Sequence, residues 1–312
     1  MTDVVATAGG TGPSGSGPFS GPWRGVNRLF RRRRPLAIVS LLGPAVAWMV
    51  LIYIASLVLM IVSAFFKIDG FTSKPTDETT IDNVQRAFTT YTFFVVVRRS
   101  VFIAAGVTAV CLVIAVPVAF YIAKVARRWA RRGLIVAMLM PLWAGYLVKG
   151  YAWKAMLRPA PLVGDQDGGV LDSMFGYTPG FGYVAVILAL TYLWLPYMVL
   201  PIYAGLERLP SSLLEASGDL GAKPLRTFTG VVVPMLVPSI AAGSIFTFSL
   251  SLGDYIMPRL VTEGKVTMVG SIIYSTLLAP NQPLAAAYTI WPLLLIVVYL
   301  FAMRRLGAFD SL

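Results

Sequence analysis

The chain has 312 residues, of which 57% are hydrophobic and only 13% are charged. Soluble domains carry about 25% charged residues, so this composition excludes an ordinary soluble protein and predicts an integral membrane protein. The formal net charge is +12, but the basic residues cluster beside apolar segments, as topology determinants do, and we expect no binding to nucleic acid. There is no histidine and one cysteine, so neither a catalytic site, a metal site nor an internal disulfide is expected.

Residues 1–35 are expected to form a disordered, basic cytoplasmic tail, because the first 22 are rich in Gly, Ser, Pro and Thr and RLFRRRRP follows. The next apolar run is too long for a signal-peptide core and lacks a small-residue cleavage site, so we expect an uncleaved span. About 20 apolar residues cross a bilayer as a helix. Six spans are therefore predicted within one transmembrane domain, residues 36–312, at 36–62, 101–123, 134–157, 183–203, 231–252 and 284–303. The expected fold is all-α.

Lysines and arginines in the short loops predict the orientation, since they remain on the cytoplasmic side. Both termini and the loop between the fourth and fifth spans are then cytoplasmic, and the segments 66–92, 158–182 and 255–283 are external. Cys111, deep in an apolar run, is expected to be a buried thiol. The basic residues assigned to the cytoplasmic side are Arg24, Arg28, Arg31 to Arg34, Lys124, Arg127, Arg128, Arg131, Arg132, Arg208, Lys223, Arg226, Arg304 and Arg305.

One loop is out of place among the apolar runs, namely EASGDLGAKPLRTFTGVVVP at residues 215–234. Ser212 and Glu215 fit a capping box that starts a short helix. Gly221 is placed to stop that helix in the left-handed conformation, and Pro224 to begin a second helix that enters the membrane. Leu213, Ala216 and Leu220 share one face of the short helix. From local chemistry alone, this face suits lipid headgroups or a groove on another protein.

With six spans, this loop resembles the cytoplasmic loop of the permease subunit of type I ABC importers. That family carries E-A-A, three residues, Gly, nine residues and I-x-L-P; here the same spacing holds Glu215-Ala216-Ser217, Gly221 and Val231-x-Val233-Pro234. Ser217, Val231 and Val233 depart from the family pattern. The resemblance implies a coupling helix that inserts into a cleft of the ATPase subunit. The residues carried over to this role are Glu215, Ala216, Ser217, Leu220, Gly221 and Pro234.

The resemblance also implies the partners of the chain. They are two ABC ATPase chains, a second and non-identical permease, an extracytoplasmic substrate-binding protein and the inner-membrane bilayer of a prokaryote. The chain itself has no G-x-x-x-x-G-K-[ST] phosphate loop. ATP and Mg would accordingly be bound by the ATPase partners, and this subunit would bind no cofactor and catalyse no reaction.

Three segments narrow the resemblance to spermidine/putrescine permeases, and to the first of their two permease subunits. They are MPLWAGYLVKGYAWKAML, YLWLPYMVLPIYAGLERLPSSLLEAS and SLGDYIMPRLV, at residues 140–157, 192–217 and 251–261. Related branches for iron, thiosulfate or phosphonates share much of this pattern and stay open as alternatives. A secondary transporter or a membrane assembly protein would be expected to lack an ATPase partner.

A flexible polycation needs carboxylates for its ammonium groups and aromatic faces for cation–π contact. The substrate path is therefore predicted at Asp254, Tyr255, Trp194, Tyr146 and Trp153. Two other accounts remain: the aromatic residues would form a belt at the membrane interface, and Arg259 would neutralise Asp254. Lys149 and Lys154 are expected to snorkel to the outer interface rather than line a cation path.

Overall fold

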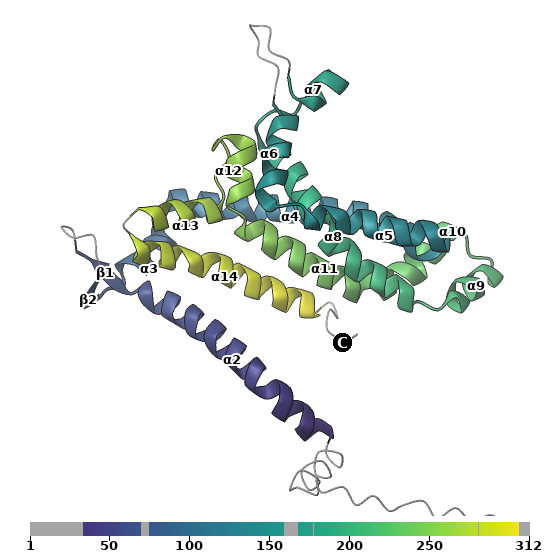
Figure 1. Ribbon diagram of the computed structural model, residues 1–312, viewed down its shortest axis with the longest axis horizontal. Coiled ribbons are helices and arrows are strands. Elements are labelled where there is room, and N and C mark those ends of the chain that lie inside the picture. The colour runs from purple at the N-terminus through teal and green to yellow at the C-terminus, as the bar shows by residue number, and fades with distance from the viewer. Residues whose placement is uncertain (1–33, 70–74, 159–167, 177, 280, 306–312) are drawn as a thin grey trace, which may run out of the picture. The chain divides into compact units, whose positions relative to one another are not determined.

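The structure is a computed structural model that describes residues 34–69, 75–158, 168–176, 178–279 and 281–305. The predicted tail, residues 1–35, lies almost wholly outside the described residues. The described chain is helical apart from one short hairpin (Figure 1). Its elements are α2 (Arg34–Ser63), β1 (Phe66–Ile68), β2 (Pro75–Thr79), α3 (Asp82–Thr89), α4 (Tyr91–Phe120), the π-helical segment η1 (Tyr121–Val125), α5 (Arg128–Trp143), α6 (Tyr146–Met156), α7 (Val170–Phe175), α8 (Tyr183–Arg208), α9 (Ser211–Asp219), α10 (Pro224–Thr227), the π-helical segment η2 (Phe228–Val232), α11 (Val233–Gly253), α12 (Ile256–Thr262), α13 (Val269–Leu278) and α14 (Gln282–Arg305).

The chain divides into two compact units, residues 1–59 and 60–312. The described part of the first unit is most of α2, which carries Pro44 within it. From Leu42 to Ser63 this helix is long and apolar enough to cross a membrane. The end of α2 and all later elements belong to the second unit.

The core of the second unit lies where α4, α8 and α11 pack together. Val107, Leu190 and Leu236, one from each of these helices, are fully buried there. Cys111 is also fully buried and its Sγ lies 3.6 Å from the carbonyl oxygen of Thr191, which confirms the predicted buried thiol. Small residues let α8 and α11 approach closely, since a Cβ on Gly243 would lie 3.1 Å from a backbone oxygen of α8.

Five described helical segments are long and apolar enough to span a bilayer, and the bent pair α5–α6 makes six if it is one span. The five are Leu42–Ser63, Tyr91–Val125, Tyr183–Arg208, Pro224–Gly253 and Gln282–Arg305. The predicted third span, residues 134–157, is not one continuous helix, because α5 and α6 meet at 95°. Pro141 removes one helical N–H, and Ala144 and Gly145 then adopt extended conformations, so the helix breaks there. The number six stays a prediction.

A second break follows α11. The chain turns at Asp254 into the short helix α12 and then into α13, which packs against α14. Figure 1 shows α6 and α12 projecting to the same side of the bundle formed by α4, α8, α11 and α14. The backbone N–H of Val269, at the start of α13, donates to the buried hydroxyl of Ser100 at 2.8 Å, which ties α13 to α4. The second break therefore lies inside a packed assembly of helices, whereas Trp143, Ala144 and Gly145 at the first break are exposed.

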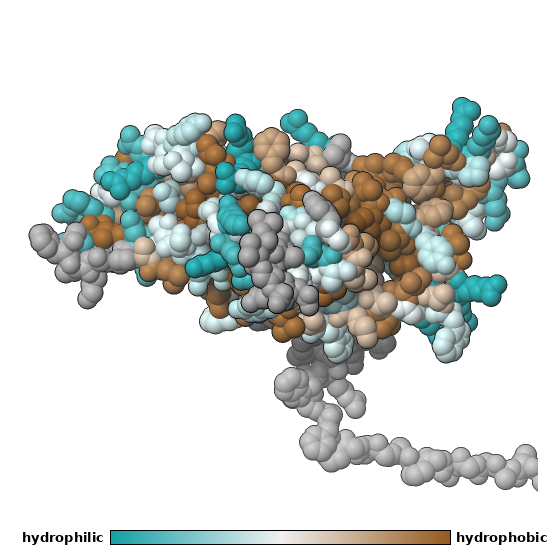
Figure 2. Space-filling view, turned by 90° about the horizontal axis from the view of Figure 1, so that it is seen from above, coloured by the Kyte–Doolittle hydropathy of each residue, from teal (hydrophilic) through white to brown (hydrophobic). Residues whose placement is uncertain are grey.

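The two ends of this unit differ in their elements. The β1–β2 hairpin and α3 lie at one end, and α9 and α10 lie at the other (Figure 1). The indole N–H of Trp291 donates to the carbonyl oxygen of Ala87 at 2.9 Å and fixes α14 against α3. In the space-filling view, hydrophilic residues gather at both ends and apolar residues are prominent between them, right of centre (Figure 2). This distribution is typical of a protein that crosses a bilayer.

Candidate functional site

Helix α9 begins at Ser211, with Pro210 as its N-cap residue, and no side chain caps its first turn. The predicted capping box of Ser212 and Glu215 is therefore wrong. A capping box needs its serine just before the first helical residue, whereas Ser212 is already the second helical residue. Pro210, with φ −62° and ψ 135°, supplies the extended conformation that an N-cap position requires. Glu215 is exposed on the helix that follows.

The end of α9 is a Schellman motif centred on Gly221, as the glycine predicted. Gly221 has φ +75°, its N–H donates to the carbonyl oxygen of Gly218 at 2.8 Å, and the N–H of Ala222 donates to that of Ser217 at 3.1 Å. These two bonds satisfy carbonyl groups that the helix end would otherwise leave free. Pro224 then occupies the first turn of α10, also as predicted. The chain makes a sharp corner between two helical segments.

The two sides of α9 have different surroundings. Leu214 packs against the hydrophobic core, and the hydroxyl of Ser217 lies 2.8 Å from that of Thr227 on α10. The face predicted from Leu213, Ala216 and Leu220 is exposed, with Leu220 88% accessible. Thr227 was missed in the sequence, although a serine in place of the second alanine of E-A-A was a signal that a polar partner lay nearby. Helix α9 is thus held by one side and presents small and apolar residues on the other. Pro234, the last residue of the matched pattern, is exposed in the first turn of α11.

A polar network fixes the point where the chain enters α9. Lys124 in η1 donates through Nζ to the carbonyl oxygen of Leu209 at 2.8 Å. Arg131 on α5 donates to the hydroxyl of Tyr203 at 2.9 and 2.6 Å, and it forms an ion pair with Glu207. The Tyr203 hydroxyl in turn donates to the Glu207 carboxylate at 2.7 Å. The last two turns of α8 and its C-cap residue Leu209 are therefore connected to η1 and α5.

A cavity of about 330 Å³ lies at the break between α11 and α12. It brings together four of the five residues predicted for a substrate path, from three separate parts of the chain. The fifth, Trp153, does not line this cavity and instead lies against Tyr192, with ring centroids 5.8 Å apart. The lining residues are Tyr146, Trp194, Ser249, Leu250, Gly253, Asp254, Tyr255 and Ile256.

Asp254 joins the two helix breaks. Its Oδ1 accepts hydrogen bonds from the backbone N–H groups of Ile256 and Met257, both at 3.1 Å, and so caps the start of α12. Its Oδ2 accepts a hydrogen bond from the hydroxyl of Tyr146, at the start of α6. Only 8% of Asp254 is accessible. Among the described residues it forms no ion pair, so the alternative account, in which Arg259 neutralises Asp254, has no direct contact to support it.

Two further polar atoms of this cavity are unsatisfied hydrogen-bonding groups among the described residues. The indole N–H of Trp194 and the hydroxyl of Ser249 are buried, and neither has a hydrogen-bond partner within the described part of the chain. Buried polar groups are nearly always paired, and those that are not require an explanation. Here both belong to residues that line the cavity. They are therefore candidates to contact a bound molecule.

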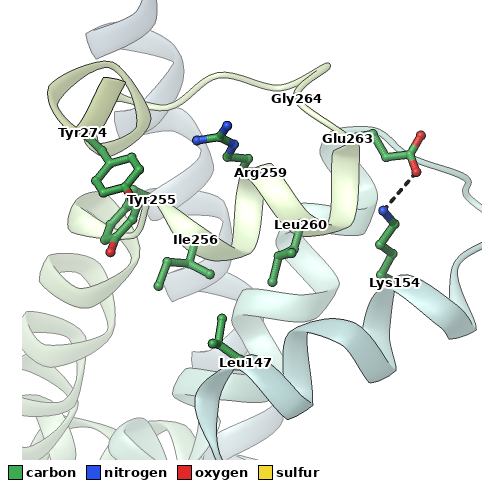
Figure 3. A pocket seen from close by; sticks show the side chains of 9 residues that line it. All are labelled: Leu147, Lys154, Tyr255, Ile256, Arg259, Leu260, Glu263, Gly264 and Tyr274. Carbon is green, nitrogen blue, oxygen red and sulfur yellow. Dashed lines mark ion pairs between the residues drawn. The ribbon is translucent and has the colours of Figure 1, made fainter. Parts of the chain in front are cut away.

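A second cavity, of about 670 Å³, adjoins the first, since Tyr255 and Ile256 line both. The rings of Tyr255 and Tyr274 are stacked with centroids 4.5 Å apart. Figure 3 shows the Arg259 side chain extending towards these two tyrosines. Lys154 pairs with Glu263 at 3.1 Å, so this lysine has a carboxylate partner at the cavity edge (Figure 3). The other lining residues are Leu147, Leu260 and Gly264.

Comparison with known proteins identifies the relatives of this chain. Residues 23–308 match the family model described as "Binding-protein-dependent transport system inner membrane component". The chain is 39% identical over 295 residues to the inner membrane ABC transporter permease protein YdcU of Escherichia coli, covering 87% of this chain and 90% of that protein. It is 30% identical over 264 residues to the spermidine/putrescine transport system permease protein PotB of Haemophilus influenzae, covering 83% and 90%.

The fold is similar to that of a solved chain from a bacterial alginate ABC transporter in complex with an alginate pentasaccharide-bound periplasmic protein. The TM-score is 0.69 at 15% sequence identity, over 92% of this chain and 96% of that chain. At this identity the likeness concerns the fold alone. The family match over nearly the whole length, together with the helical membrane fold, shows that the chain belongs to the binding-protein-dependent inner membrane components, the permease subunits of ABC importers.

Proposed function

We propose that the chain is one of two non-identical permeases of an ABC importer for small organic cations, with a polyamine such as spermidine or putrescine as its substrate. The observation that carries this proposal is the cavity that joins Asp254 to Tyr146, Trp194 and Tyr255. A carboxylate and aromatic faces together suit an ammonium group and its methylene chain. The relatives named as spermidine/putrescine permeases support the same substrate class.

The other substrate classes fit this cavity less well. No lysine or arginine is among its lining residues, so thiosulfate or a phosphonate would meet no positive charge there. Asp254 is the only carboxylate, histidine or cysteine of the lining, whereas a bare iron ion needs several such ligands. The hydroxyl of Ser249 adds an acceptor for an ammonium N–H. The cavity chemistry thus favours an organic cation.

We propose further that α9 is the coupling helix, which docks into a cleft on an ABC ATPase chain that binds ATP and Mg. Support comes from the exposed Leu213–Ala216–Leu220 face, the rigid corner at Gly221 and the network at the end of α8. Movement of the ATPase would then reach α5 and α8 directly. The orientation that follows places the α9 end and both termini in the cytoplasm. The many lysines and arginines near that end support this orientation.

The test of the substrate is uptake by the reconstituted importer, assembled with its co-purifying ATPase, second permease and binding protein. Asp254→Asn removes the charge but keeps an oxygen that can cap α12, so folding should be preserved. A hydrogen bond to a charged group contributes about 1.5–3 kcal/mol, and we therefore expect the spermidine concentration for half-maximal uptake to rise about tenfold or more.

The matched control is Glu78→Gln, which neutralises an exposed carboxylate of the β1–β2 hairpin that lines neither cavity. Its uptake should stay close to that of the unmodified importer. Unchanged spermidine kinetics in Asp254→Asn would reduce Asp254 to a structural cap. If no ATPase co-purifies in mild detergent, the coupling role of α9 is lost, and a secondary transporter or assembly protein returns as the better explanation.

A further inference from the structure

A groove of about 600 Å³ lies between α4 and the start of α8, away from both cavities described above. Residues of α4 spaced three and four apart form one wall, and the first turns of α8 form the other. Val95, Arg98, Arg99, Phe102 and Ile103 come from α4, and Tyr183 and Ile187 from α8. The groove has a basic part and an apolar part.

The basic part consists of Arg98 and Arg99. The Arg99 guanidinium carbon lies 5.7 Å from the centroid of the Tyr183 ring, which fixes this side chain across the groove. No aspartate or glutamate lines the groove, and the ion pairs among the described residues involve other side chains. Each guanidinium carries five N–H donors in a geometry that matches phosphate oxygens. Two adjacent arginines thus present a site for an anion.

The apolar part begins one helical turn further along α4. Phe102 is 72% exposed, and Ile103 below it is buried. Ile187 faces them from α8 and lies close to Gly106, whose Cβ position would be 3.7 Å from the Ile187 side chain. The arginines are within the first turns of α4, near the bundle end that carries α3, and the apolar wall continues towards the middle of the bundle (Figure 1). Charge at the membrane surface and apolar surface beneath it is the layout of a phospholipid.

We propose that this groove binds one anionic phospholipid, with its phosphate on Arg98 and Arg99 and an acyl chain along Phe102 and Ile187. The site is separate from substrate binding and from ATPase docking, and it goes beyond the proposed function. A soluble phosphate ester would use the arginines alone and would have no contact with the apolar wall. Lipid and soluble phosphate can therefore be told apart.

The test uses the full chain with its co-purifying subunits in nanodiscs of phosphatidylcholine that contain a small fraction of phosphatidylglycerol. After transfer to mild detergent, native mass spectrometry counts the phosphatidylglycerol that stays bound. Hydrogen bonds from a guanidinium to a phosphate are charge-assisted and therefore strong, so Arg98→Gln with Arg99→Gln should lower retention at least about tenfold. Phe102→Ser, at an exposed position that leaves the arginines intact, should also lower retention.

The matched control is Arg127→Gln with Arg128→Gln, an exposed arginine pair at the start of α5 that lines none of the three cavities. Equal retention in the Arg98/Arg99 variant and the unmodified chain overturns the proposal. An equal loss in the control pair overturns it too, because the effect would then follow net charge alone. Displacement of the lipid by glycerol 3-phosphate would identify a soluble-phosphate site instead, and failure of glycerol 3-phosphate to compete supports the lipid.

Discussion

Gly221 allows a direct test of the proposed docking role of α9. Its φ of +75° places it in the left-handed region, and a Cβ built on it would meet no atom within 4 Å. Replacing it with alanine therefore adds backbone strain and no steric clash. For an L-residue this conformation costs about 1–2 kcal/mol.

That cost lowers the fraction of molecules in which the α9–α10 corner has its observed geometry. The fraction falls by up to about 5- to 30-fold if an alternative corner is accessible, and the apparent Kd for the ATPase chain rises by the same factor. Asparagine tolerates the left-handed region better than alanine, so Gly221→Asn should have a smaller effect. Gly221→Val should have the largest, because β-branching opposes positive φ.

The control is Gly218→Ala on the same helix. No atom lies within 4 Å of its Cβ position either, but its φ is not positive, and it lies on the other side of α9 from Leu213, Ala216 and Leu220. Alanine there should leave ATPase affinity unchanged, or raise it slightly, since alanine stabilises a helix by about 1 kcal/mol over glycine. The assay is titration of the purified ATPase chain onto the permease pair in nanodiscs, with substrate-stimulated ATP hydrolysis as a second readout.

The order Val, Ala, Asn, Gly in decreasing Kd is the expected outcome. If Gly221→Ala and Gly218→Ala bind the ATPase equally well, the left-handed corner is not required for docking. If both variants lose binding equally, the effect comes from added side-chain volume, and the argument from backbone conformation is refuted. Correct membrane insertion of each variant is checked by its elution as a single species during size-exclusion chromatography.

Two further outcomes follow from individual contacts. Ser217→Ala and Thr227→Val should each weaken ATPase docking. A double-mutant cycle should give a coupling energy of about 0.5–1.5 kcal/mol for the hydrogen bond between the two side chains. Additive effects of the two substitutions would show that this hydrogen bond does not contribute to docking. Gly243→Ala should lower the free energy of unfolding by about 1–3 kcal/mol, and with it the thermal midpoint, because its Cβ would press on the backbone of Met198. Gly253→Ala, with open space around the Cβ position, should leave the midpoint unchanged. Equal midpoints would show that α8 and α11 separate at little cost.

Local rules of chain conformation predicted part of the α9 region and failed at one point. The stop at Gly221 and the start at Pro224 follow from backbone preferences that depend on one residue each. The S-x-x-E pattern at Ser212 is equally local, but a stronger local signal preceded it. Pro210 already has the φ of an N-cap residue, so the helix begins directly after it and Ser212 falls inside. The contact between Ser217 and Thr227 depends on the corner between two helices, which the pattern does not encode.

The cavity at Asp254 was harder to predict from the sequence. Asp254 was predicted for the substrate path because it is a lone carboxylate at the end of an apolar run. The other residues were predicted because they are aromatic. Its contact with Tyr146 is created by the 95° bend after α5, which hydropathy alone does not reveal because the run stays apolar across it. Trp153 shares a face of α6 with Tyr146 but lies about 10 Å further along the helix at 1.5 Å per residue, beyond the reach of the cavity. Residue types in the sequence thus indicated the candidate cavity, but only the three-dimensional structure shows which residues line it.

Most of the cavity wall comes from the ends of α6, α11 and α12, with Trp194 from the middle of α8, whereas the packed core comes mainly from the faces of α4, α8 and α11. A change at Ser249 alters the cavity wall without removing a hydrophobic side chain from that core. Tyr146 and Trp194, by contrast, also pack against the core, and Asp254 also caps α12. Under the proposed function, substitutions at a position such as Ser249 change transport selectivity with little loss of stability. Under that proposal, a lineage acquires a new substrate through a few substitutions in the cavity wall while the core of the bundle diverges slowly.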